Sequence, residues 1–168
     1  MWWRQCVKMV REDFAWKDRP VLVHSVRTAV AAVASWSVAR LFGLPEAYWA
    51  PITTLMIVQS SLGAALTVSW QRFVGTALGS SVGAIAATYF GPHVLALGVG
   101  VLILGLLCAA TKVDRSAYRF GGIALAIVLL VPRTGSAWQI ALHRFAEVSI
   151  GIAVALFLTL VWPERESQ

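Results

Sequence analysis

Long apolar runs dominate the chain, separated by short breaks that contain glycine, proline or charge. A helix needs about 20 apolar residues to cross the hydrocarbon of a bilayer. Runs that approach this length fall near 23–42, 48–66, 73–90, 94–110, 117–132 and 145–162. Gly43, the Gly91-Pro92 pair and Pro132 stand at the ends of runs, as helix breakers do. The pattern predicts an all-α, polytopic membrane bundle of about six transmembrane helices, with antiparallel neighbours because every connection is short.

The composition indicates the same class of protein. Hydrophobic residues make up 58% of the chain and charged residues 13%, and the mean hydropathy is +0.73. A soluble domain carries about 25% charged residues. The net charge of +6 is spread along the chain instead of gathering on a soluble domain. We therefore expect membrane lipid as a partner and no binding of nucleic acid.

The chain divides into three segments. Residues 1–22 mix charged side chains with tryptophan, valine and phenylalanine at roughly helical spacing, which is typical of an amphipathic helix on a membrane surface. A frayed tail is the alternative for this cytoplasmic N-terminal segment. Residues 23–162 form the predicted six-helix integral membrane domain, and residues 163–168 form a short cytoplasmic tail.

Lysine and arginine predict the orientation, since the cytoplasmic loops of membrane proteins carry an excess of both. If both termini are cytoplasmic, ten of these residues lie on that side, namely Arg4, Lys8, Arg11, Lys17, Arg19, Arg72, Lys112, Arg115, Arg119 and Arg165. Three lie on the other side, namely Arg40, Arg133 and Arg144. We expect a multi-pass protein of the plasma membrane, the inner membrane of a bacterial cell, with cytoplasmic termini.

The stretch from Tyr48 to Gly83 carries two membrane motifs. The Tyr48-Trp49 pair opens an apolar run, as aromatic residues do at the membrane interface. Gly75, Gly79 and Gly83 recur every four residues and so share one face of a helix. Small residues on one face let membrane helices approach closely, so these three glycines are predicted to form a helix-packing ridge.

These motifs resemble the fusaric acid resistance (FUSC) and aromatic acid exporter group of integral membrane proteins, and more distantly the aluminium-activated malate transporters of plants. The resemblance begins near His24, is strongest over 43–83, recurs in 144–152 and ends at Trp162-Pro163. It implies a transporter or permease module that exports small organic anions, such as aromatic carboxylic acids, across the inner membrane.

Other functions remain open beside transport. The longer exporters that the chain resembles carry two membrane modules and a soluble region, whereas this chain has one module; a homo-oligomer, a dimer or higher, would restore the missing half. A non-transporting membrane scaffold or accessory subunit would instead use the glycine ridge to bind partner helices. An anion channel is the third interpretation, suggested by the similarity to the malate transporters.

The chain also matches itself. A shift of 72 residues superimposes Gly63, Ala65, Arg72, Phe73, Gly79 and Val82 on Gly135, Ala137, Arg144, Phe145, Gly151 and Val154. Three helices reverse the direction of the chain, so repeats of three helices would have inverted topology, a plan that places a transporter's substrate site at the repeat interface. A chance match between segments of biased composition is the alternative.

Three arginines are candidates for binding an anionic substrate. Arg27 lies inside the first apolar run, where an unpaired charge is costly; it either points into the bundle or reaches back to the interface, as long side chains do. Arg72 and Arg144 are expected at the N-terminal ends of helices, where free N–H groups and a partial positive charge favour a carboxylate. Anchoring at the interface is the alternative for both.

Two further polar residues are candidates. Glu147 lies three residues after Arg144, so the two side chains share a helix face and neutralise each other; alternatively, Glu147 is a protonatable site that couples export to the proton gradient. Gln59 belongs to a polar step, residues 59–61, near the middle of the second run. Such groups bond to a neighbouring helix or line a water-filled cavity, where Gln59 would contact the substrate.

The residues that enzymes use do not cluster in this sequence. His24, His93 and His143 are far apart and lack the spacing of metal ligands, and no glycine-rich phosphate loop with a lysine is present. Cys6 and Cys108 do not form a disulfide framework. We expect no enzymatic activity, no cofactor and no metal.

Overall fold

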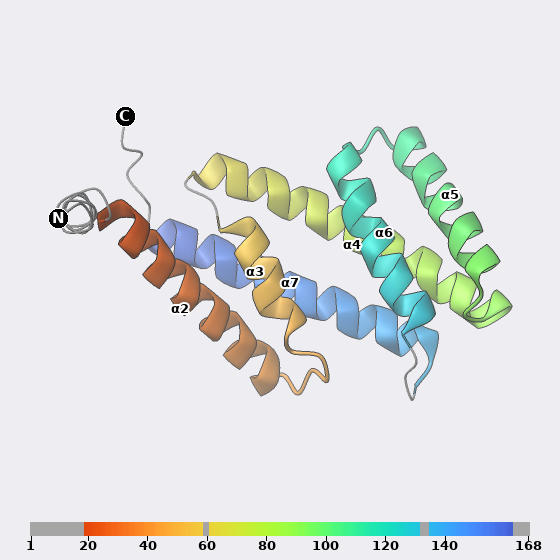
Figure 1. Ribbon diagram of the computed structural model, residues 1–168, viewed down its shortest axis with the longest axis horizontal. Helices are drawn as coiled ribbons and strands as arrows, with labels where there is room; N and C mark the ends of the chain where they lie inside the picture. Colours follow the sequence, from red (N-terminus) through yellow and green to blue (C-terminus); the bar gives the residue numbers. More distant parts are fainter. Residues whose placement is uncertain (1–18, 59–60, 132–134, 163–168) are drawn as a thin grey trace, which may run out of the picture.

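The computed structural model describes residues 19–58, 61–131 and 135–162, and all regular secondary structure in these ranges is α-helical (Figure 1). The helices of these ranges are α2 (Arg19–Leu41), α3 (Trp49–Ile57), α4 (Leu62–Phe90), α5 (Val94–Ala110), α6 (Arg115–Leu130) and α7 (Ala137–Val161). The predicted all-α class is confirmed. The expected amphipathic segment before Arg19 and the tail after Trp162 lie outside the described residues.

The lengths and surfaces of the helices suit a membrane. Within the described ranges, three helices are long and apolar enough to cross one, namely α2 from Leu22 onward, α4 and α7. α5 is apolar but shorter, with 17 residues. Large apolar side chains cover the outside of the bundle; Leu102 and Phe157, for example, are each 63% exposed. Such an exterior is suited to lipid chains rather than water, so the chain forms a helical membrane bundle.

The second predicted span ends earlier than expected. The sequence predicts one helix over 48–66, but α3 ends at Ile57 and α4 starts at Leu62. The Ser61 hydroxyl accepts a hydrogen bond from the Ala64 N–H at 3.3 Å and so caps α4. Serine is a favoured N-cap residue, and the polar step therefore separates two helices instead of lying within one.

The turn predicted before residue 73 is absent. α4 continues for 29 residues, and Arg72 stands ten residues after its first residue. Arginine and glutamine are good helix formers, so Gln71 and Arg72 do not interrupt the helix although they interrupt the apolar run. The third predicted span is thus the second half of a longer helix.

The last helix begins before its predicted span, 145–162. Ser136 and Gln139 form a capping box, in which each side chain bonds to the backbone N–H of the other residue. This pairing satisfies two N–H groups at a helix start and places the beginning of α7 at Ala137. Arg144 therefore stands seven residues inside α7.

These corrections move Arg72 and Arg144 out of the loops without changing the predicted orientation. Nine lysines and arginines remain on the side of the termini once Arg72 is removed from the ten, and two remain on the other side once Arg144 is removed from the three. α2 begins and α7 ends at the same end of the bundle (Figure 1). We refer to this as the terminal end.

The glycine ridge of α4 packs inside the bundle. An added Cβ at Gly75 would collide with the carbonyl oxygen of Ala117, and one at Gly79 with that of Gly121, both on α6. Gly83 continues this contact one turn further along α4. The backbones of α4 and α6 therefore touch, and the ridge serves packing within the chain.

The two halves of the chain pack in matching ways. α3 packs on α7 as α6 packs on α4, and α2 contacts α3 and α7 as α5 contacts α6 and α4. α4 and α7 contact each other and run in opposite directions (Figure 1). Phe73 and Phe145, which the 72-residue shift makes equivalent, meet with ring centroids 4.9 Å apart. Equivalent residues in contact lie on the axis that relates two halves, so the packing supports the predicted inverted repeat.

The closest helix contacts follow the same relation. Gly151 on α7 stands 72 residues after Gly79, and an added Cβ there would lie 2.5 Å from the Ala50 carbonyl oxygen on α3. The Thr54 hydroxyl of α3 donates a hydrogen bond to the Gly151 carbonyl at 3.0 Å. Each short helix, α3 or α6, is therefore held against a glycine of a long one.

We predict that Gly79→Leu disrupts the fold and that Gly98→Leu does not. A leucine at position 79 would collide with backbone of α6, which cannot turn aside as a side chain does, and overpacking costs about 1–3 kcal/mol or more. Gly98 on α5 has no atom within 4 Å of an added Cβ. Thermal unfolding of both variants in detergent measures the difference; equal stability of the two would contradict the α4–α6 contact.

Candidate functional site

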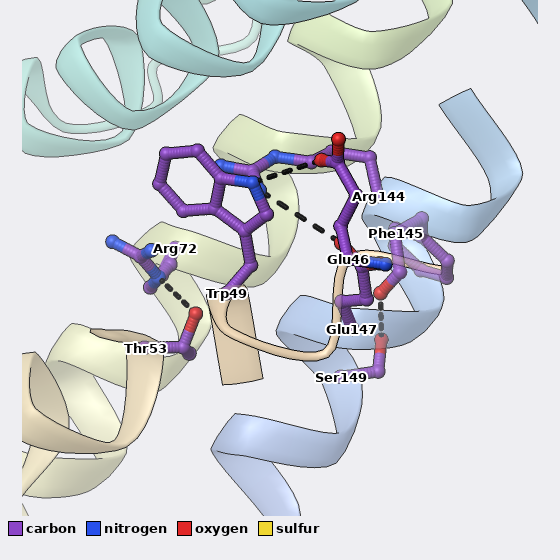
Figure 2. Close-up of polar contacts among 8 residues, drawn as sticks. All are labelled: Glu46, Trp49, Thr53, Arg72, Arg144, Phe145, Glu147 and Ser149. Carbon is purple, nitrogen blue, oxygen red and sulfur yellow. Dashed lines mark hydrogen bonds and ion pairs between the residues drawn. The ribbon is translucent and has the colours of Figure 1, made fainter. Parts of the chain in front are cut away.

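Arg72 places a buried guanidinium where three helices meet. It stands on α4 with 4% of its surface exposed. Its Nε–H donates a hydrogen bond to the Thr53 hydroxyl of α3 at 3.2 Å (Figure 2), and its Nη1 lies 2.8 Å from the Met56 sulfur of the same helix. The ring centroid of Phe120 on α6 lies 5.0 Å from its Cζ, a cation–π distance. We call these four residues the Arg72 site.

The partners of Arg72 are uncharged. Among the described residues, no carboxylate lies within ion-pair distance of its guanidinium. α3 ends one residue after Met56, and a helix C-terminus contributes a partial negative charge of about half an electron. Half a charge does not balance a guanidinium, so the Arg72 site keeps a net positive charge inside a membrane bundle, where such a charge is costly.

A helix break lies beside this site. α3 has nine residues, which span about 14 Å at 1.5 Å per residue and cannot cross the hydrocarbon. Val58 is extended, and its N–H donates to the Thr54 carbonyl at 2.9 Å. Gln59, predicted to contact the substrate, follows directly but lies outside the described residues.

Arg144 is buried as well, but acidic residues accompany it (Figure 2). Arg144 and Glu147 on α7 are 2% and 1% exposed, and Arg144 Nη1 lies 3.9 Å from Glu147 Oε2. The Arg144 Cζ lies 3.4 Å from the centroid of the Trp49 ring. Glu46, in the loop before α3, donates its backbone N–H to Glu147 Oε1 at 3.1 Å and accepts the Trp49 Nε1–H at 3.0 Å. We call these four residues the Arg144 site.

The aromatic contacts of the two sites match under the repeat. Arg144 stands 72 residues after Arg72, and Phe120 stands 71 residues after Trp49. In each half, an arginine of a long helix thus lies against an aromatic ring of the short helix that packs on it. The same scaffold therefore builds both sites.

The charges of the two sites do not match. Counting back 72 residues from Glu147 leads to Gly75, and counting forward 71 residues from Glu46 leads to Ala117. Neither replacement carries a charge, and Gly75 and Ala117 contact each other as Glu147 and Glu46 do. The scaffold therefore holds one arginine with neutral partners and one with two carboxylates.

Arg27 lies apart from both sites. It is fully buried on α2, so its side chain points into the bundle, and its Nη2 donates to the Thr159 hydroxyl of α7 at 3.3 Å. Thr159 stands 15 residues after Arg144, roughly 22 Å along the helix axis. The structure therefore groups Arg72 with Arg144 and leaves Arg27 elsewhere.

The expected helix-end positions of Arg72 and Arg144 are wrong. Both stand at least seven residues inside their helices, whereas free backbone N–H groups occur only in the first turn. Helix ends therefore add nothing to anion binding at either residue. Interface anchoring does not describe them either, because both guanidinium groups are buried.

The sequence did not predict which residues surround the arginines. Glu46 and Thr53 lie in the segment of strongest family resemblance but were given no role, and Phe120 carried no motif. Trp49 was expected to lie at the membrane interface, whereas its ring lies against Arg144. One signal was available: the internal repeat carries Trp49 to within one residue of Phe120. The same shift leads from the two acidic residues to positions without charge, so it would have shown that the other half lacks them.

Comparisons with known proteins are informative at the level of family. Inner membrane protein YeeA of Escherichia coli K12 is 30% identical over 149 residues, which are 86% of this chain and 42% of that protein. Inner membrane protein YccS of the same strain is 26% identical over 142 residues, 84% of this chain and 20% of that protein. A protein of Mycobacterium tuberculosis H37Rv named "Putative arylamide transporter" is 27% identical over 150 residues, 86% of this chain and 42% of its own length.

The chain thus spans less than half the length of these relatives. No solved structure matches it. A family model described as "Fusaric acid resistance protein-like" matches residues 33–158, from the middle of α2 almost to the end of α7. Since this match covers most of the chain and all of both arginine sites, the chain belongs to the fusaric acid resistance protein-like family of membrane proteins.

Proposed function

We propose that this chain is a transport module that moves small organic anions, aromatic carboxylic acids among them, out of the cytoplasm across the bacterial inner membrane, and that Arg72 binds the anion. One observation carries the proposal: a buried arginine with uncharged partners stands beside the end of a helix that is too short to cross the bilayer. A bound anion would balance this charge. The family and the name of the mycobacterial relative support transport as the activity.

A carboxylate suits the groups at the Arg72 site. A guanidinium offers five N–H donors in a planar fork, and a thioether is a weak acceptor, so a carboxylate oxygen would replace the Met56 sulfur at Nη1. The Thr53 hydroxyl accepts the Nε–H and retains its own hydrogen for the second carboxylate oxygen. The Phe120 ring offers an apolar surface against which an aryl group would pack.

The charge distribution supports export. The excess of lysine and arginine on the terminal side attracts organic anions there, and we propose that this side is cytoplasmic. A bacterial interior is electrically negative, and moving one charge through 100 mV is worth about 2.3 kcal/mol. The membrane potential would therefore favour the exit of an organic anion from the cell.

The scaffold interpretation loses the surface on which it was based, because the glycine ridge is occupied by α6. A homo-oligomer stays part of our proposal. It would form through other faces of the bundle, for which the exposed apolar side chains of α5 and α7 are available. A carrier and a channel differ in whether flux saturates at high substrate concentration.

We predict that Arg72→Gln lowers the flux of labelled benzoate in proteoliposomes at least about tenfold, the equivalent of 1.4 kcal/mol of lost anion stabilisation. Arg72→Lys keeps the charge but loses the two-pronged geometry, so its flux should be intermediate. Arg40→Gln serves as the matched control, since Arg40 is an exposed arginine of α2 that lies over Trp36. Wild-type flux in Arg72→Gln, with equal amounts of protein, would remove Arg72 from the pathway.

We also predict that reporters fused to the two ends of the chain both report a cytoplasmic location. The nine-to-two charge asymmetry and the common end of α2 and α7 (Figure 1) are the physical reasons. Reporters on opposite faces of the membrane would contradict the common location of the start of α2 and the end of α7.

A further inference from the structure

We propose that Arg144 is a second anion site and that the Glu147 carboxylate is its gate, which occupies the guanidinium until an incoming anion displaces it. The inference rests on the proposed function, in which Arg72 binds the anion first. It gives a role to the acidic residues that distinguish one half of the module from the other.

The two sites share one scaffold. Each arginine lies against an aromatic ring of the short helix that packs on its own helix, and each stands one residue before the Phe73–Phe145 contact on the repeat axis. A scaffold that binds a carboxylate at Arg72 therefore offers the same kind of cation–ring pair at Arg144, with the ring at 3.4 Å instead of 5.0 Å. Only the ligand differs: at Arg144, the protein's own carboxylate is already present.

Glu147 is not part of the scaffold that the two halves share. Its matching position in the other half is Gly75, so the carboxylate is an addition to the shared scaffold rather than a part of it. Glu147 is 1% exposed and accepts the backbone N–H of Glu46 at 3.1 Å, which holds it beside Arg144. A substrate carboxylate would take over the contact with Arg144 from a group of the same chemistry and charge, and the displaced Glu147 carboxylate would then repel it.

The two sites follow one another along α3. Thr53, which contacts Arg72, and Trp49, which contacts Arg144, lie four residues apart on α3, a rise of about 6 Å. α3 runs toward the terminal end (Figure 1), so the Arg72 site lies nearer that end and the Arg144 site nearer the opposite one. An exported anion would reach Arg72 first and Arg144 second.

A gate of this kind has a physical use. Transport requires sites that bind well enough to attract the ion but not so well that they retain it. Two open cationic sites about one helix turn apart would retain two anions. With Glu147 in place, the Arg144 guanidinium already has a carboxylate partner when an anion arrives, and the returning Glu147 carboxylate helps to expel that anion.

The test is the number of benzoate ions bound at equilibrium by the full chain in lipid nanodiscs, counted with labelled benzoate. We expect one site in the wild type and two in Glu147→Gln. Glu147→Gly, which introduces the residue of the matching position, should also have two sites. This variant replaces Glu147→Gln in the test if the glutamine variant does not fold. The double variant Glu147→Gln with Arg144→Gln should return to one. His143→Gln, an exposed neighbour on α7, should retain one.

The outcomes separate this inference from the proposed function. One site in both Glu147 variants would overturn the gate while leaving Arg72 as the anion site. No site in the wild type but one in Glu147→Gln, lost again with Arg144→Gln, would support the gate and refute the role of Arg72. Two sites in the wild type would show that Glu147 does not block Arg144, and would also overturn the gate.

Discussion

Arginine burial inside a membrane bundle is the constraint on which the rest of this structure depends. A charge at membrane depth costs from a few kcal/mol upward, so each guanidinium requires particular groups beside it. Arg144 has a ring and carboxylates, and Arg72 has a ring, a hydroxyl and a sulfur. Apart from Glu147, which is on α7, these groups stand on α3, on α6 and in the loop before α3, so the short helices must approach the long ones closely. Gly79 and Gly151 permit that approach, because their missing side chains let two backbones touch.

The break after α3 belongs to the same arrangement. An irregular backbone is tolerated at membrane depth only where protein or water surrounds it, and Ile57 and Val58 are 0% and 7% exposed. The end of α3 therefore lies inside the bundle and not against lipid. The break also ends α3 one residue after Met56, so the partial negative charge of the helix C-terminus lies close to a residue that contacts Arg72. The polar step thus reduces the cost of burying Arg72 without removing its charge.

The features that the sequence predicted are those that depend on short-range patterns or on the repeat. Apolar runs predicted the helical membrane bundle, and glycines four residues apart predicted a packing face. Helix ends were misplaced, because Arg72 interrupts hydropathy without interrupting a helix, and because the capping signal at Ser136 went unused. The site was only half predicted. Glu46 and Glu147 are 101 residues apart in the chain, and no local pattern shows that two such residues will meet.

The inverted repeat explains why an asymmetry of charge matters. A two-fold axis makes the paths from the two faces of the membrane alike, so identical sites would present an anion with the same energies from either side. The carboxylates of Glu46 and Glu147 remove that equivalence, because they leave one site positive and give the other a surplus of negative charge. Such an asymmetry cannot drive net transport, since the direction of flux depends on the concentration gradient and the membrane potential. It determines instead where an anion binds first, which is at Arg72. To pass the Arg144 site, the anion must then displace the Glu147 carboxylate.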